Sequence, residues 1–347
     1  MKVLIVGGTG NISTPITELL LERGDEVTLV NRGKSDDSSN VQSARLDRLH
    51  RITADRKSYS EFERAMRSSG TFDAVIDMVC FLEEEAESAI RAFRGITNQY
   101  VFCSTVDVYS KNAKRYPIVE DDERRPLLSF PYAYQKAKCE ERLIEADRRG
   151  DFKLTIIRPA ATYSNGGPIH SFRGGTYNLD RIEKGKPIIL HGDGMSIWSA
   201  CHSIDVARAF VNALGNPKAY GNAYHVTGEE WMTWNYYWQC AADAVGSPLP
   251  ELVHIPTDLL IAIAPDLASW AKENFQHNNI FDNSRAREDL GFRYTVRWKD
   301  GIRAAVEHLR ANGPFEDSAK YPWYDRIIEV WKRHSAQMIE ELKSSFS

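Results

Sequence analysis

Tyr132 and Lys136 are the residues of this 347-residue chain whose types and spacing point most directly to chemistry. They stand four positions apart in a segment that predicts a helix, so their side chains share one helix face. A tyrosine with an ordinary pKa of about 10 is a poor base at neutral pH. An adjacent ammonium favours the phenolate, so we expect Lys136 to lower the pKa of Tyr132. The pair predicts a base that takes a proton from a substrate hydroxyl.

A second pair with the same spacing, Tyr134 and Lys138, lies in the same segment. Tyrosine and lysine also meet at this spacing by chance in many helices. The pair is therefore interpreted together with the elements that must position it.

The start of the chain predicts a dinucleotide-binding turn. Residues 2–6 form a β-branched apolar run typical of a strand buried on both faces. The sequence Gly-Gly-Thr-Gly-Asn-Ile-Ser follows at 7–13, then an amphipathic stretch to 23 and a second strand at 26–30. This is the context that a glycine-rich phosphate-binding turn requires. Ser13 stands where the pattern usually has its last glycine, so slightly looser packing of helix on strand is expected there. The expected cofactor contacts in the turn are Gly7, Thr9, Gly10, Asn11 and Ile12.

The residues after the second strand concern cofactor choice. An NAD-preferring protein typically has an acidic residue there for the ribose 2′-hydroxyl, whereas this chain has Asn31 and Arg32. Arg32 can pair with a 2′-phosphate, and Asn31 can hydrogen-bond either form. The sequence therefore predicts NAD(P), with NADP favoured over NAD, although a solvated surface charge is nearly as good an explanation of Arg32.

With these features the chain resembles the extended short-chain dehydrogenase/reductase family, the NAD(P)-dependent epimerases and dehydratases of sugars. The resemblance covers nearly the whole chain, and the order and spacing of its pieces are more specific than any one of them. The matching pieces are residues 7–13, 54–56, 101–109, 132–136 with Glu140, 157–159, 192–194, His202 with 205–208, and 285–292.

The resemblance assigns roles to particular residues. It implies that Thr105 holds the substrate oxygen, although a strand-end hydroxyl capping a turn is the alternative. It selects Tyr132 and Lys136 over the second pair, because the family's lysine is typically followed four residues later by a glutamate, here Glu140. Lys136 would also bind the nicotinamide ribose. Asp55 and Arg56 would lie near the adenine, and the bulkier residues at 77–81 would make the wall beside the cofactor different from that of relatives.

The implied reaction begins with hydride transfer, which forms a keto intermediate. Return of hydride to the opposite face gives an epimerase, which is the leading expectation because it needs no further catalytic group. Loss of water gives a dehydratase, and release or reduction of the ketone gives a dehydrogenase or reductase. Asp107 occupies the place of the family's proton-abstracting glutamate, so we consider it a catalytic candidate, with a solvated or capping carboxylate as the alternative.

The substrate is expected to be a sugar or sugar derivative. Nucleotide-sugar members usually carry a diphosphate-binding arginine where this chain has Trp198, and an indole can stack on a sugar but cannot neutralise phosphate. A free sugar, glycoside or other polyol therefore competes with a nucleotide-linked sugar. Asn178 and Arg181 are further substrate-binding candidates, although ion pairing is the better explanation of Arg173, Arg181 and Arg285. Relatives often pair through the helix bearing the Tyr-Lys motif, so a homodimer is expected.

Composition narrows the partners. The net charge of -4 argues against nucleic acid as the main partner, and no apolar run approaches the 18 residues of a membrane span. Five scattered cysteines predict a reducing, cytoplasmic setting, and no metal site is expected. Two readings of another class remain. One is an RNA-binding relative with a vestigial dinucleotide site, and the other is a redox-sensing regulator. The intact Thr105, Tyr132 and Lys136 set and the acidic balance weigh against the first, and the second would normally lack that set.

Alternating strand and helix signals predict an α/β protein with a Rossmann-type doubly wound parallel sheet and a smaller, mostly helical C-terminal substrate lobe. The dinucleotide-binding domain is expected over 1–160, with returns near 200–228. The substrate lobe is expected over 161–199 and 229–347. Residues 321–346 predict a terminal amphipathic helix packed on the body.

Overall fold

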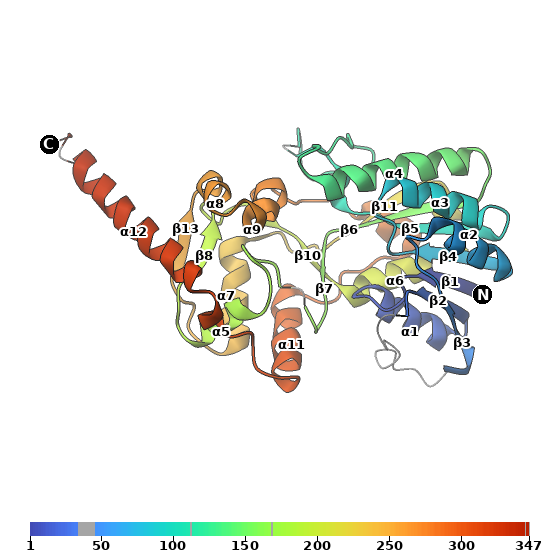
Figure 1. The fold of residues 1–347 in the computed structure, drawn as a ribbon, viewed down its shortest axis with the longest axis horizontal. Coiled ribbons are helices and arrows are strands. Elements are labelled where there is room, and N and C mark those ends of the chain that lie inside the picture. Colours follow the sequence, from blue (N-terminus) through green and yellow to red (C-terminus); the bar gives the residue numbers. More distant parts are fainter. Residues whose placement is uncertain (34–45, 112, 168, 344, 347) are drawn as a thin grey trace. The chain divides into compact units, whose positions relative to one another are not determined.

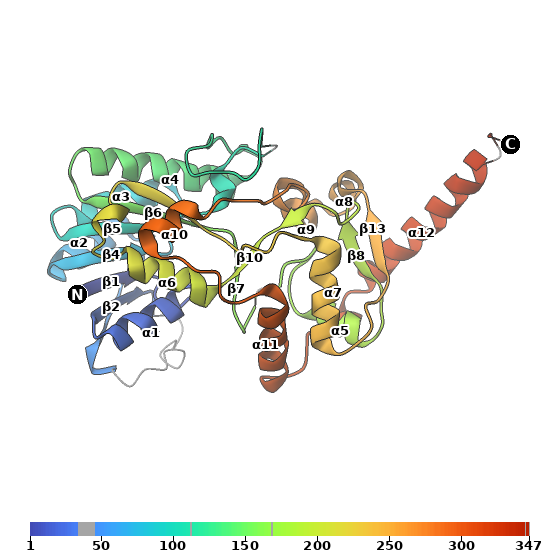
Figure 2. The ribbon, with the colours of Figure 1, turned by 180° about the vertical axis from the view of Figure 1, so that it is seen from behind.

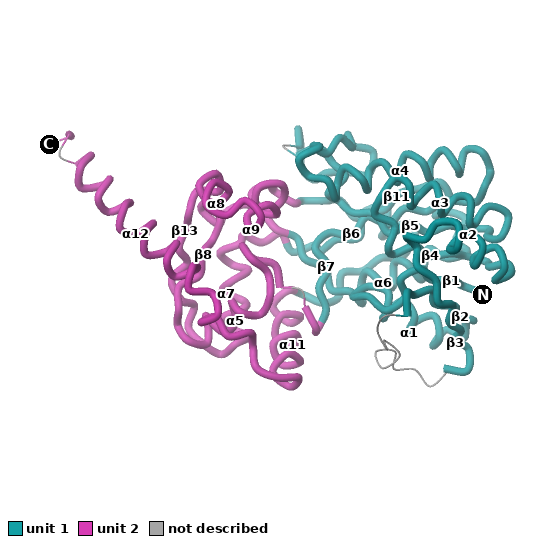
Figure 3. Tube along the Cα trace, viewed as in Figure 1, with its two compact units in different colours: residues 1–164, 199–230, 280–297 teal, residues 165–198, 231–279, 298–347 magenta. Residues whose placement is uncertain are grey.

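The computed structural model describes residues 1–33, 46–111, 113–167, 169–343 and 345–346. These residues form two compact units, each built from separate stretches of the chain (Figure 3). Unit 1 comprises 1–164, 199–230 and 280–297, and unit 2 comprises 165–198, 231–279 and 298–347.

Unit 1 contains a seven-stranded sheet in which every neighbouring pair is parallel (Figure 1). This confirms the doubly wound sheet predicted from the sequence. In spatial order the strands are β11 (Asn222–Val226), β6 (Lys153–Pro159), β5 (Thr97–Cys103), β4 (Phe72–Asp77), β1 (Lys2–Val6), β2 (Glu26–Asn31) and β3 (Leu49–Thr53). The order reverses between β1 and β4, and ligands of open α/β sheets bind at the carboxyl ends of strands at such a point.

Helices cover both faces of this sheet (Figures 1 and 2). One layer is α1 (Ser13–Arg23), α6 (Ser203–Ala213) and α10 (Ser284–Leu290), and the other is α2 (Tyr59–Ser68), α3 (Glu83–Phe93) and α4 (Pro131–Arg148). In β1, Val3 and Ile5 join the first core, whereas Leu4 and Val6 join the second. Because alternate strand residues point to opposite faces, a strand covered on both is apolar throughout.

The segment 280–297 belongs to unit 1, whereas the expected division placed everything after residue 229 in the second lobe. Its apolar side chains, Ala286, Leu290 and Phe292, lie in the core under α1 and α6. A short parallel pair, β7 (Ala161–Tyr163) and β10 (Ala200–His202), completes this unit.

Unit 2 is mostly helical. Two short strand pairs accompany its helices: β8 (Ile188–His191) with β13 (Leu252–Ile255), and β9 (Ile197–Trp198) with β12 (Met232–Thr233). The helices are α5 (Tyr177–Glu183), α7 (Trp234–Val245), α8 (Thr257–Ile263), α9 (Pro265–Trp270), α11 (Trp298–Ala311) and α12 (Pro322–Lys343). Within the described part of the chain, every helix is too short or too polar to cross a bilayer.

Candidate active site

The glycine turn after β1 is held in place by β2. Gly7 N–H donates to Val30 O at 2.9 Å, and Gly8 N–H donates to the side chain of Asn31 at 3.2 Å. Gly7 has a φ of +81°, and a Cβ there would lie 2.5 Å from Val79 Cγ1. The turn therefore requires glycine at this position, and Asn31 fixes its geometry from the end of the neighbouring strand.

Ser13, at the first position of α1, braces the same turn from the other side. Its hydroxyl accepts a hydrogen bond of 2.7 Å from Gly10 N–H and donates one of 2.7 Å to Gly7 O. The side chain is buried, so these bonds are shielded from water. The departure from glycine thus adds two hydrogen bonds inside the turn. The glycine pattern alone carried no signal for this role.

A cavity of about 450 Å³ opens at the carboxyl ends of β1, β2 and β3. Its lining includes the candidates Gly7, Thr9, Gly10, Asn31, Arg32, Asp55 and Arg56. Arg32 is exposed at this site. The guanidinium of Arg56 is buried, where it pairs with Asp77 and donates to Glu85 O at 2.9 Å. Arg56 thus forms part of the cavity wall, whereas the side chain of Arg32 is exposed to solvent.

A second cavity, of about 300 Å³, contains the candidate catalytic residues. It is lined by Thr105, Tyr132 and Lys136, together with Asn11 and Ile12. The two cavities share lining residues Gly7, Gly10, Val79 and Phe81. The bulky segment after β4 therefore borders both spaces, and one elongated ligand can run along the glycine turn from one space to the other.

Thr105 combines a capping role with a place in the second cavity. Its Oγ1 accepts from Asp107 N–H at 3.2 Å, which caps the turn Val106–Val108, and lies 3.1 Å from Asp107 Oδ2. The hydroxyl is also hydrogen-bonded to Tyr132. Asp107 is buried and paired with Lys111 at 3.3 Å, and it is not among the residues lining either cavity. Thr105 therefore caps this turn, which was the alternative considered from the sequence, and is also hydrogen-bonded to Tyr132.

Lys136 is buried and directed at the backbone of β5. Its ammonium donates to Cys103 O at 2.7 Å and lies 4.5 Å from the centre of the Phe81 ring. Burial raises the pKa of Tyr132, Asp107 and Cys103 raise it further, and the hydrogen bond with Thr105 offsets only part of this. This direction is opposite to the lowered pKa expected from spacing, because desolvation and the neighbouring Asp107 penalise the phenolate more than the hydrogen bond with Thr105 favours it.

On the helix that carries Tyr132 and Lys136, Glu140 forms a buried ion pair with Arg158. Glu140, one helical turn after Lys136, receives hydrogen bonds of 2.8 and 2.7 Å from Arg158 and one of 2.6 Å from Ser104. Arg158 also donates to Tyr109 OH at 2.5 Å. Although burial acts against ionisation, Arg158 and Arg124 hold the pKa of Glu140 below its ordinary value. In the sequence these residues were noted only because they match the family pattern, and their pairing with one another was not predicted.

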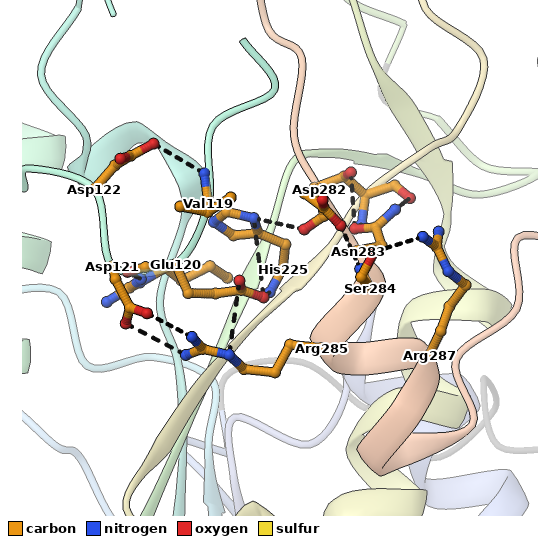
Figure 4. Close-up of polar contacts among 12 residues, drawn as sticks. Val119, Glu120, Asp121, Asp122, His225, Asp282, Asn283, Ser284, Arg285 and Arg287 are labelled. Atoms are coloured by element: carbon orange, nitrogen blue, oxygen red, sulfur yellow. Dashed lines mark hydrogen bonds and ion pairs between the residues drawn. The ribbon is translucent and has the colours of Figure 1, made fainter. Parts of the chain in front are cut away.

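The polar contacts continue around His225 (Figure 4). The imidazole lies 2.5 Å from Tyr109 OH and 2.9 Å from Asp282 O, and its backbone N–H donates to Glu120 at 3.0 Å. Arg285 pairs with Asp121 at 2.6 Å. These contacts tie the loop that precedes α4 to the segment 280–297. Burial lowers the pKa of His225 to about 3, so the ring is neutral.

The three substrate-binding candidates, Asn178, Arg181 and Trp198, lie in unit 2, and all are buried. Arg181 donates to Pro187 O at 2.7 Å and pairs with Asp325 at 2.5 Å. The Trp198 ring packs 4.6 Å from that of Trp234. These contacts belong to the unit 2 core, and none of the three residues lines either of the two cavities described above.

The remaining charged candidates are also paired. Arg173 pairs with Glu316 at 3.1 Å, and Arg285 with Asp121 as above, as ion pairing predicted. In the part of the chain that the structure describes, His, Cys, Asp and Glu side chains form no group of three or more arranged to hold a metal.

One family model matches most of the chain. The model described as the NAD dependent epimerase/dehydratase family matches residues 3–227. The chain is 31% identical over 337 residues to the Arabidopsis thaliana chloroplast stem-loop binding protein of 41 kDa b, covering 94% of this chain and 84% of that protein. It is 26% identical over 284 residues to the 2′-dehydrokanamycin reductase of Streptomyces kanamyceticus, covering 81% and 77%. The fold is similar to that of the UDP-glucuronic acid 4-epimerase of Bacillus cereus in complex with NAD, with a TM-score of 0.71, 18% identity and coverage of 90% and 100%.

Proposed function

Because the chain belongs to the NAD-dependent epimerase/dehydratase family, we propose that it is an NAD(P)-dependent epimerase of a sugar or sugar derivative, acting through a transient keto intermediate. The observation that carries this proposal is the second cavity. Thr105, Tyr132 and Lys136 line it together with the glycine turn, so acid–base groups and a dinucleotide-binding element border one space.

The residues present fit a dinucleotide. Gly10 borders both cavities, and the nearest atom to a Cβ at that position is Ser13 Oγ at 3.4 Å, so the turn is open toward the space. The α1 N-terminus and the backbone of residues 10–12 would hold the pyrophosphate. Asp55 would border the adenosine end, and Lys136 the nicotinamide ribose. When bound, the cofactor would supply a hydride acceptor and donor.

NADP is the proposed preference. Arg32 follows β2, is exposed, and lines the larger cavity, whereas neither the last residue of the strand, Asn31, nor the two described residues after it carry a carboxylate. A guanidinium binds a phosphate strongly, while the 2′-hydroxyl of NAD offers it no charge.

In the proposed chemistry, Thr105 holds the substrate oxygen and Tyr132 moves its proton. The raised pKa of Tyr132 keeps the phenol protonated before substrate binds. The side chain is therefore ready to protonate a carbonyl oxygen. To take the proton of a substrate hydroxyl, the phenol must first release its own proton to solvent, and the phenolate then accepts the proton of the hydroxyl. Lys136, whose ammonium donates to Cys103 O, would bind the nicotinamide ribose. Asp107 lines neither cavity, so we propose that it acts through its hydrogen bond with Thr105, by positioning that hydroxyl, rather than by taking a proton from the substrate.

A second candidate is a reductase of a keto sugar. Two observations favour it: the protonated Tyr132 is suited to general-acid work, and 2′-dehydrokanamycin reductase is similar over 81% of this chain. Such a substrate does not have to be a nucleotide-linked sugar.

A candidate of another class is RNA binding, favoured by the 31% identity to a protein named for stem-loop binding. The retained Thr105, Tyr132 and Lys136 arrangement and the net charge of -4 weigh against it as the main function.

We also propose a homodimer through α4, the helix bearing the Tyr-Lys motif.

The decisive experiment identifies the ligand retained through purification by mass spectrometry, then analyses products on free, glycosidic and nucleotide-linked sugars. Epimerisation without net cofactor oxidation supports the main proposal, whereas stoichiometric consumption of NADPH supports the reductase. Dinucleotide binding without turnover across the panel, together with salt-dependent RNA retention, would reject both enzymatic proposals.

A further inference from the structure

Phe81, four residues after the end of β4, borders both cavities. The residues that line both are Gly7, Gly10, Val79 and Phe81, and of these Phe81 alone carries a ring. Its side chain is 43% exposed, so the ring is not part of the unit 1 core. The sequence predicted that bulky residues at 77–81 change the wall beside the cofactor, and the contacts of Phe81 give that difference a specific role.

Hydrogen bonds hold the main chain that carries this ring. Val79 N–H donates to Asp77 Oδ1 at 3.1 Å, and Phe81 N–H donates to Glu85 Oε2 at 2.6 Å. Both acceptors belong to buried residues, one at the end of β4 and the other in the first turn of α3. The backbone of Phe81 is therefore held from both sides, and the ring position depends only on a few side-chain rotamers.

The Phe81 ring contacts the ammonium of Lys136. The Nζ atom lies 4.5 Å from the centre of this ring and 4.9 Å from that of the Phe102 ring, and it donates to Cys103 O at 2.7 Å. Phe102 is buried in the core of unit 1 and lines neither cavity. Of the two rings beside the ammonium, Phe81 is therefore the one that also borders the space available to a ligand.

The ammonium of Lys136 is buried without a carboxylate partner. The residue is 1% exposed, and in the part of the chain that the structure describes it forms no ion pair. Glu140, four residues later on the same helix, is instead bonded to Arg158 and Ser104. Burying a charge is costly unless other groups compensate, and an aromatic face attracts a cation more strongly where water is excluded. One carbonyl and two ring faces provide this compensation for Lys136.

We propose that Phe81 is a positioning residue for Lys136, whose aromatic face keeps the ammonium shielded from water and directed at the end of β5 for binding the ribose of a dinucleotide. This role rests on the dinucleotide-dependent function proposed above. A small side chain at position 81 would admit water to the ammonium and free the flexible lysine stem. Ligand binding would then have to dehydrate and order Lys136, which lowers affinity.

Isothermal titration with NADPH and NADH tests the role of the aromatic face. Phe81→Ala is expected to raise the dissociation constant about ten-fold, the loss of one cation–π contact shielded from water. Phe81→Tyr keeps the face and should stay within about two-fold of wild type, whereas Phe81→Leu keeps only the apolar bulk and should lose most of what alanine loses. Wild-type affinity in Phe81→Leu would overturn the proposal.

The matched control is Leu82→Ala. Leu82 is the next residue along the chain, is 39% exposed and lines neither cavity, so its removal should leave dinucleotide affinity unchanged. Equal losses in Leu82→Ala and Phe81→Ala would mean that any truncation in this segment disturbs the site, which would contradict a specific role for Phe81. Circular dichroism and thermal unfolding check that the variants keep their fold.

A double-mutant cycle tests the route through Lys136. If Phe81 acts through the ammonium, adding Phe81→Ala to Lys136→Met should change the dissociation constant little further, because the group that the ring positions is already gone. An undiminished effect of Phe81→Ala in the methionine background would refute this route.

The same titrations separate this inference from the proposed function. A wild-type protein that binds neither dinucleotide would reject the proposed function and this role together. Dinucleotide binding by the wild-type protein that Phe81→Ala leaves unchanged would reject the role of Phe81 alone.

Discussion

The ammonium of Lys136 is hydrogen-bonded to the carbonyl of Cys103 at 2.7 Å, while Tyr132, four residues earlier on α4, is hydrogen-bonded to Thr105. The two side chains share a helix face and one cavity, yet each has its own partner on the chain that leaves β5. The hydroxyl of Tyr132 is therefore positioned by Thr105, and Lys136 is positioned by the strand.

Tyr132→Phe is expected to abolish turnover, by at least about a hundred-fold, because it removes the group that moves the substrate proton. Cofactor affinity should remain nearly unchanged, since the ring that lines the cavity is kept. Turnover assays and cofactor titration check this. Tyr134→Phe, four residues before Lys138 on the same helix, is the matched control and should keep its activity. Unchanged turnover in Tyr132→Phe would remove this residue from the mechanism.

Lys136→Met is expected to impair both turnover and cofactor binding, because the lost ammonium borders the ribose side of the cavity and organises the end of β5. Lys138→Met is the control: this lysine pairs with Glu141 at 2.7 Å near the surface of α4. Isothermal titration and steady-state kinetics distinguish the two effects. If the two methionine variants behave alike, the choice of the first Tyr-Lys pair is refuted.

Arg32→Ala is expected to weaken NADP binding by about ten- to a hundred-fold, which corresponds to loss of one charged hydrogen-bonding partner. NAD binding should change little, because its 2′-hydroxyl carries no charge. The measurement is the ratio of the two dissociation constants in wild type and variant. Lys57→Ala, another basic residue lining this cavity, is a useful comparison. An equal loss for both cofactors, or none, would reject the phosphate role.

Arg158→Met is expected to lower the free energy of unfolding by about 3–5 kcal/mol, the range for breaking a buried ion pair by removing one partner. Glu140 would keep Arg124 but would lose two hydrogen bonds while remaining buried. Arg142→Met removes an arginine at the surface of α4, the helix that carries Glu140, and should change the free energy of unfolding far less. Guanidinium unfolding measures both. A small effect in Arg158→Met would mean that the pair contributes little to holding β6 against α4.

Stability is expected to fall as the pH decreases from 7 toward 4. Burial lowers the pKa of His225 to about 3 and that of His191 to about 4, against an unfolded value of about 6.5. Between these values the unfolded chain binds protons that the folded chain does not, so each histidine contributes a loss of up to about 1.4 kcal/mol per pH unit. His225→Gln should show a shallower pH slope than wild type, whereas the exposed control His334→Gln should not. An unchanged slope in His225→Gln would contradict the neutral, buried imidazole.

The local sequence was sufficient for the main elements of unit 1. The apolar run of β1, the glycine turn and the start of α1 follow from side-chain type and backbone preference over a few residues, and the structure has them where they were expected. Residues of the glycine turn line the second cavity together with Tyr132 and Lys136. They meet there because parallel strands end at one edge of a sheet, and the alternation of strands and helices in the sequence implies a parallel sheet.

Tertiary structure decided what depends on contacts between distant segments. The pKa of Tyr132 is raised because burial, together with Asp107 and Cys103, outweighs the hydrogen bond with Thr105, and helix spacing does not report burial. Arg158 meets Glu140 only when β6 lies beside α4, and 280–297 joins unit 1 only when its apolar residues meet α1 and α6. In α12 the apolar residues recur at helical spacing, yet Tyr324 and Ile328 are buried while Met338 and Leu342 are exposed, so the predicted packing of the terminal helix on the body is wrong for its second half. Periodicity determines which side of a helix is apolar, whereas the partner that covers it depends on the rest of the fold.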